Sequence, residues 1–300
     1  MTENRNALTA SLLVVSSGIL WGFYWLPVRS LETMGLSGAW GTAAITLCAV
    51  LVMLVFTLLR GSRLRTRSYA GIFWVGLGGA SFALYSIGFV YGRVAIIILL
   101  FFLTPVWSTL IGRVVLGWHT PLMRVLAIVA GLAGLGVMLG AGGEAPVPRN
   151  IGEWMALVSG IMWSVATTGM RVQTDLEPAE ATFVFVVGAF CAALPIAFLL
   201  DPLPTAIPFR DAASVAGLAL LTGALWWSLF VVGLMWATVR LEPARAGILF
   251  MSEVLVGAAS AAVIAGEYLS ALEVTGGVLV LLAGVLEIQP WRRTSSATDL

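Results

Sequence analysis

Ten long apolar runs occupy most of this chain of 300 residues. Each can cross a bilayer, because an apolar core of about 30 Å needs roughly 20 apolar residues per helix. Only 10% of the residues are charged, against about 25% in soluble domains, so the chain cannot cover itself with a polar surface. The sequence therefore predicts an all-α integral membrane protein with ten transmembrane helices, at residues 8–28, 38–59, 69–91, 94–113, 122–141, 153–172, 181–200, 213–237, 244–265 and 272–289.

Short sequences recur in the same order in the two halves of the chain. Gly18-Ile-Leu-Trp-Gly22 is repeated as Gly160-Ile-Met-Trp-Ser164, which places Trp163 142 positions after Trp21. Later, Thr104-Pro105-Val106 aligns with Glu253-Val254-Leu255 at an offset of 149. Two related halves of five spans each must face opposite ways, as in many secondary transporters. We expect a first five-helix repeat over 8–141, a periplasmic linker over 142–152, a second, inverted five-helix repeat over 153–289 and a cytoplasmic tail over 290–300.

The positions of the arginines predict the orientation of the chain. If the N-terminus is cytoplasmic, twelve of the sixteen arginines fall in cytoplasmic segments, and only Arg29, Arg93, Arg149 and Arg210 fall outside. Cytoplasmic loops of membrane proteins carry the excess of basic residues. The sequence therefore predicts that the N- and C-termini are both cytoplasmic.

The residue inventory excludes several function classes. The chain has no Lys, so it lacks the Lys of a Walker-type phosphate loop and the amine that forms a Schiff base with a cofactor. A net charge of +1 gives no reason to expect nucleic acid. A membrane-embedded enzyme is disfavoured because there is one His and no pair of Asp within a span. A channel or a structural assembly protein stays open as an alternative, and we expect no cofactor, no metal and no enzymatic activity.

Glu253 is the only acidic residue near the middle of a predicted span. A carboxylate at that depth costs about 2.5 kcal/mol or more, and such residues are commonly functional. We expect Glu253 to serve as an ion or proton site or as a substrate anchor; the alternative is a structural hydrogen bond to broken backbone near Gly257. On the equivalent helix, Pro105 predicts a kink, because proline removes a helix hydrogen bond.

Tryptophans usually form belts at the membrane surfaces, but five of the twelve lie deep within their predicted spans: Trp21, Trp107, Trp163, Trp226 and Trp227. In the sixth span, Ser and Thr residues share a broad helix face with Trp163, and a polar face should point into the protein or towards water. The alternative is that these hydroxyls bond to carbonyls of their own helix. The predicted substrate-binding residues are Trp163, Trp21, Tyr85, Ser86, Thr167, Thr104, Ser252 and Trp227.

Two further groups of residues lead to predictions, one about solvent exposure and one about helix packing. Glu267 and Glu273 fall at the outer ends of the last two helices, where we expect them to be solvated. Small residues let membrane helices approach closely. The glycines of the fifth and tenth spans therefore predict close packing, either against the bundle or against a second copy in a homodimer: Gly131, Gly134, Gly136, Gly140, Gly276, Gly277 and Gly284.

The paired patterns resemble the EamA-type repeats of the drug/metabolite transporter superfamily, from about residue 8 to residue 289. The resemblance rests on the Trp in the first helix of each half, on 241–247 (Leu-Glu-Pro-Ala-Arg-Ala-Gly), on Glu253 and on Gly266-Glu267. The first half departs from the pattern, with Thr104-Pro105 and Gly117-Trp118 in place of Glu-Pro and Gly-Glu.

Within that superfamily, the aromatic-rich helices look most like those of the YddG-type amino-acid exporters. This resemblance implies a multi-pass secondary transporter of the bacterial cytoplasmic (inner) membrane that exports amino acids by alternating access. The substrates would be aromatic, hydrophobic and other amino acids, with broad specificity. A multidrug or lipophilic-cation exporter of the same superfamily is the alternative. The partners implied are a small-molecule substrate and the lipid bilayer.

Overall fold

The structure is a computed structural model that describes residues 2–60, 69–115, 117, 122–143, 145–173, 176–204, 209–238, 240–241 and 249–288. Helices make up all of the regular structure in these ranges, which contain no strand. The motif residues 242–247, Trp118 and the predicted tail lie outside the described residues.

One to three helical elements lie in each predicted range. The first half contains α1 (Thr2–Gly22), α2 (Trp25–Thr33), α3 (Trp40–Leu59), α4 (Tyr69–Tyr91), α5 (Val94–Phe101), α6 (Thr104–Val114), α7 (Leu122–Leu139) and a short 3-10 turn, η1 (Gly140–Gly142). The second half contains α8 (Ile151–Gln173), α9 (Pro178–Leu200), α10 (Phe209–Thr222), a π-helix, η2 (Gly223–Phe230), α11 (Val231–Thr238), α13 (Ser252–Ile264) and α14 (Ala271–Ile288).

By length and composition, seven helical segments among the described residues can cross a membrane: Leu8–Thr33, Trp40–Leu59, Tyr69–Tyr91, Val94–Val114, Val125–Gly142, Pro178–Leu200 and Asp211–Ala237. Helix α8 is not among them, and Ser252–Ile264 and Ala271–Leu286 are shorter apolar helices. The protein is thus all-helical with several membrane-spanning segments, while the ten-span inverted topology and the orientation of the termini stay predictions.

Two helices of the two halves are interrupted at equivalent positions. The break between α5 and α6 falls at Phe102 and Leu103, and α13 begins directly after Met251, which is 149 positions beyond Phe102. In the first half the cause is Pro105, in the first turn of α6. Proline has no N–H for the carbonyl of Phe101, four residues earlier. The Thr104 hydroxyl donates to that carbonyl instead, at 2.6 Å.

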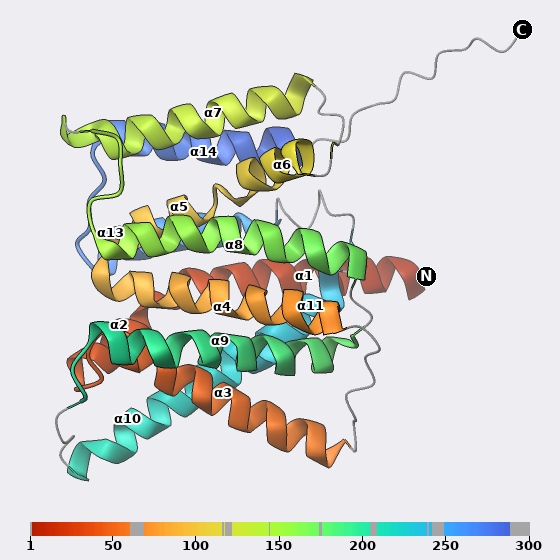
Figure 1. Cartoon of the computed structure of the whole chain (residues 1–300), viewed down its shortest axis with the longest axis vertical. Helices are drawn as coiled ribbons and strands as arrows, with labels where there is room; N and C mark the ends of the chain where they lie inside the picture. Colours follow the sequence, from red (N-terminus) through yellow and green to blue (C-terminus); the bar gives the residue numbers. More distant parts are fainter. Residues whose placement is uncertain are drawn as a thin grey trace, which may run out of the picture.

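Helix α4 lies in the middle of the bundle, between α8 and α9 (Figure 1). The absence of a side chain at Gly79 permits this close packing, because a Cβ there would overlap the Phe185 carbonyl of α9. At one edge of the bundle α7 packs along α14, and at the opposite edge lie α3 and α10 (Figure 1).

The glycines of α7 and α14 face each other within one chain. A Cβ at Gly134 would come within 2.6 Å of the Gly276 carbonyl oxygen, and a Cβ at Gly276 would come as close to Gly134. These helices were expected to pack either within the bundle or against a second copy of the chain. The structure shows packing within the bundle, and a homodimer stays a prediction.

Candidate substrate site

Phe82 of α4 stands at the centre of an aromatic cluster in the bundle. The tryptophans of the repeated motif both pack edge-on against its ring, with centroids 5.2 Å away for Trp21 and 4.9 Å away for Trp163. Phe185 of α9 lies 5.4 Å from the same ring, and Trp227 of η2 lies 6.5 Å away. The cluster therefore joins aromatic side chains from both halves around one residue of α4.

A chain of hydrogen bonds runs beside this cluster through four buried side chains. The Trp227 indole donates to the Tyr24 hydroxyl at 2.9 Å. That hydroxyl and the Ser86 hydroxyl are 2.8 Å apart, and Ser86 is 2.7 Å from the hydroxyl of Thr42 in α3. Because buried polar groups cost free energy when they are unpaired, this chain fixes η2 of the second half against α3 and α4 of the first.

Glu253 lies in the first turn of α13 and is 1% exposed. The Tyr85 hydroxyl donates to its Oε1 at 2.8 Å, and the Tyr85 ring stacks on Phe101 with centroids 4.5 Å apart. No ion pair within the described ranges involves Glu253. Its hydrogen-bond partner is thus a tyrosine of the other half, not backbone near Gly257.

The structure brings six predicted site residues together within or beside the cluster: Trp21, Trp163, Tyr85, Ser86, Trp227 and Glu253. Three predicted hydroxyls instead bond to nearby carbonyls. Thr167 donates to the carbonyl of Trp163 at 2.8 Å, Thr104 donates to Phe101, and Ser252 donates to the carbonyl of Leu249 at 2.8 Å. For Thr167 this is the bond within its own helix that the sequence left open as the alternative, and Ser252 also donates to the Val15 carbonyl of α1 at 3.3 Å.

Two buried polar atoms have no hydrogen-bond partner among the described residues: Ser17 Oγ and Trp107 Nε1. Ser17 lies one helical turn before Trp21 in α1, and Trp107 lies one turn into α6, after the break at Pro105. Such groups are few in folded proteins, and each requires a physical reason. A ligand that accepts hydrogen bonds is one such reason.

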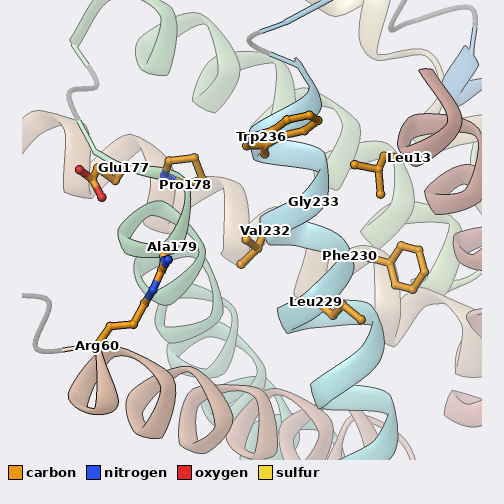
Figure 2. A pocket seen from close by; sticks show the side chains of 10 residues that line it. All are labelled: Leu13, Arg60, Glu177, Pro178, Ala179, Leu229, Phe230, Val232, Gly233 and Trp236. Atoms are coloured by element: carbon orange, nitrogen blue, oxygen red, sulfur yellow. The ribbon is translucent and has the colours of Figure 1, made fainter. Parts of the chain in front are cut away.

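A cavity of about 500 Å³ opens towards the end of the bundle where α3 ends and α9 begins. Figure 2 shows Arg60 and Glu177 at this end, with Val232, Gly233 and Trp236 of α11 beside Leu13 of α1. Phe230 and Leu229 of η2 complete one wall. Leu13, which lines the cavity, precedes Trp21 of the aromatic cluster by eight residues, about 12 Å along a helix.

At the other end of the bundle, acidic residues of the second half pair with arginines of the first. Arg29 Nη1 lies 2.8 Å from Glu267 Oε1, and Arg93 pairs with Glu273. The two glutamate side chains are only 13% and 14% exposed. The expectation that they are solvated was wrong, because each glutamate finds an arginine contributed by a distant part of the chain.

Three comparisons with known proteins bear on this architecture. Residues 150–287 match the model of the EamA-like transporter family. The second half of the chain is thus similar to an EamA-like transporter domain. No curated protein matches the chain.

Twenty-one chains of solved structures match this one. One of them, titled only "Crystal structure of protein", shares 17% sequence identity and superposes with a TM-score of 0.58. The match covers 92% of this chain and 95% of the other. At this identity the likeness concerns the fold, and it extends over both halves.

Phe82 was not among the predicted site residues. The chain contains fourteen Phe, and nothing in the sequence distinguishes Phe82 from the others. Tyr24 shares a predicted helix face with Trp21, but nothing in the sequence shows that it meets Ser86 and Trp227. The ion pairs, by contrast, could have been predicted from the sequence. Arg29 and Arg93 were predicted on the same membrane side as Glu267 and Glu273, and opposite charges there are candidates for pairing.

Proposed function

We propose that this chain is a secondary transporter that exports amino acids, with broad specificity for aromatic and other hydrophobic ones, by alternating access. The observation that carries the proposal is the buried carboxylate of Glu253, bonded to Tyr85 beside an aromatic cluster contributed by both halves. A carboxylate in an apolar surrounding attracts an ammonium group, and aromatic faces accept an apolar side chain as well as a cation.

Each part of the site has a proposed role. Trp163, which is the partly exposed tryptophan of the repeated pair, would cover the substrate side chain from the second half, opposite Trp21. Glu253 would hold the substrate ammonium or a coupled proton. The unpartnered donors on Ser17 and Trp107 would suit the substrate carboxylate, which accepts hydrogen bonds.

The proposal includes the predicted topology. Ten spans in two inverted repeats, with both termini in the cytoplasm of a bacterium, would place the cavity beside Trp236 on the cytoplasmic side. A substrate to be exported would enter there. The breaks at Pro105 and at Met251 would supply bending points in equivalent helices of the two halves.

Export of lipophilic cations is a second candidate, favoured by the same observation. An anionic Glu253 next to aromatic faces suits a quaternary ammonium or phosphonium ion, which lacks the carboxylate of an amino acid. The two candidates differ in the need for donors such as Trp107, which a cation without a carboxylate does not use.

The test is flux in proteoliposomes that contain the purified full-length chain. Uptake of radiolabelled tryptophan, phenylalanine, leucine and glutamate would be measured with and without an imposed pH gradient, with protein-free liposomes as the control. We expect saturable, stereoselective flux of the hydrophobic amino acids. Absence of flux for every amino acid, with protein that remains monodisperse, refutes the proposal. Flux of tetraphenylphosphonium that amino acids do not inhibit would favour the second candidate.

A further inference from the structure

The two ion pairs described above share a feature that the substrate site does not explain. Each joins an arginine of the first half to a glutamate of the second half, and both lie at the end of the bundle where α4 ends and α14 begins. We call Arg29, Arg93, Glu267 and Glu273 the distal latch.

Arg29 is bonded at three points. Besides its ion pair with Glu267, it donates from Nε to the Phe89 carbonyl at 2.9 Å and from Nη2 to the Gly92 carbonyl at 2.8 Å. The second oxygen of Glu267 accepts the backbone N–H of Val94 at 2.7 Å. This one pair therefore ties α2, the end of α4 and the start of α5 to the turn between α13 and α14.

Arg93, which directly precedes Val94 in the sequence, makes the second connection. It pairs with Glu273 at the start of α14 and donates to the Tyr268 carbonyl at 2.9 Å. A hydrogen bond adds to this closure, because the Tyr91 hydroxyl donates to the Asp201 carboxylate at 2.6 Å. Asp201 follows α9, so the end of α4 is held by three segments of the second half.

The opposite end of the bundle differs. The cavity of about 500 Å³ opens there, and Arg60 and Glu177 line it without forming an ion pair. Within the described ranges, both ion pairs lie at the distal end. In this structure, then, both ion pairs between the halves lie at the distal end, while at the cavity end α1 of the first half meets α11 of the second half through apolar contacts.

We propose that the distal latch is the gate on the exit side of the transport path, closed in this conformation and broken in each cycle to release the substrate. This inference rests on the proposed transporter function. The exposure of the paired side chains, 27% and 13% in one pair and 40% and 14% in the other, suits such a role. Ion pairs that are partly exposed contribute modestly to stability, so the latch biases the closed state without making it permanent.

The gate is tested by the accessibility of a cysteine placed beneath it. Phe89 is buried, its carbonyl is bound by Arg29, and its ring contacts Tyr24 and Tyr85 of the central site. In a chain with Cys48→Ala and Cys191→Ala, Phe89→Cys would report whether water reaches this layer. A membrane-impermeant, positively charged methanethiosulfonate would be applied separately to each side of proteoliposomes, so that the result does not depend on an assumed orientation.

We expect slow labelling from the distal side with the latch intact. Glu267→Gln together with Glu273→Gln should raise that labelling rate by about 10-fold, since two partly exposed pairs together shift an equilibrium by roughly that factor. The exchange Arg93→Glu with Glu273→Arg should return the rate close to that of the intact latch. Arg240→Ala is the matched control, because Arg240 bonds to the Trp236 carbonyl of its own segment.

Unchanged labelling in the double Gln variant, with the protein monodisperse in gel filtration, overturns the inference. Labelling of the charge-exchange variant that is as fast as that of the double Gln variant also overturns the inference, since the pairing itself would then not hold the gate. The labelling is measured without substrate. If no amino acid is transported, the proposed substrate is wrong, but the labelling experiment still tests whether the ion pairs form a gate.

Discussion

The Tyr85 hydroxyl makes the one hydrogen bond to the Glu253 carboxylate found among the described side chains, and its removal should destabilise the folded bundle. Tyr85→Phe deletes only the oxygen and leaves the ring stacked on Phe101. The Glu253 carboxyl would then lie at 1% exposure without this donor. An unsatisfied buried acceptor costs about 1–3 kcal/mol.

Measured side-chain hydrogen bonds in membrane proteins are weaker, about 0.6 kcal/mol on average and about 1.7 at most. The Tyr85–Glu253 bond should fall near that upper end, because both side chains are buried and the acceptor is a carboxyl group. We therefore expect a coupling free energy of about 1.5 kcal/mol, roughly a 10-fold change in the unfolding equilibrium constant.

A double-mutant cycle measures this coupling through the free energy of unfolding in SDS titrations. The cycle compares Tyr85→Phe, Glu253→Leu and the double variant with the wild type. Tyr268→Phe is the control, since Tyr268 is 79% exposed and its hydroxyl should contribute within about 0.5 kcal/mol. A coupling energy below about 0.5 kcal/mol would refute the reasoning that the buried pair holds the two halves together.

Three further predictions concern transport and packing. Trp163→Ala should reduce amino-acid flux at least about 10-fold, the loss expected when an aromatic contact worth over 1.4 kcal/mol is removed, with normal membrane insertion; wild-type flux would remove Trp163 from the site. Glu253→Gln should flatten the pH dependence of flux if this carboxyl carries the coupled proton, and an unchanged profile across pH 5–9 would leave it a structural role. Gly79→Val should prevent folding because its Cβ would overlap the Phe185 carbonyl, whereas Gly76→Ala, with open space at its own Cβ, should yield folded protein in the same size-exclusion assay.

Apolar run length proved a good guide to the helices. The range 69–91 was predicted as one span, and α4 covers Tyr69–Tyr91. Interruptions within a span were harder to predict. Pro105 marks one of them by its missing N–H, and Pro27, in the first turn of α2, stands in the same relation to Phe23 at the break after Gly22, although that break was not predicted. There the Trp226 indole donates to the Leu20 carbonyl at 2.8 Å, a contact 206 residues away along the chain.

The candidate site was predictable only in part, for a related reason. Depth within a span singled out Trp21, Trp227 and Glu253, because polar or amphipathic groups are costly there. The partner of each depends on how helices of the two halves pack, and a single apolar helix face does not encode that. Thr167 shows the converse: its hydroxyl suits a polar face, yet it bonds to the Trp163 carbonyl of its own helix.

The π-helix η2 has a consequence for how tolerant this chain is to changes in length. Its wider turns hold more residues than an α-helix of the same rise, and the Ser228 hydroxyl donates to the Gly223 carbonyl five residues back. Each α-helical residue turns the chain by about 100°. Deleting a single residue from 223–230 would therefore change the rotational setting of α11 and move Trp236 relative to the cavity. The number of residues in this segment, more than their identity, determines the rotational setting of everything that follows it.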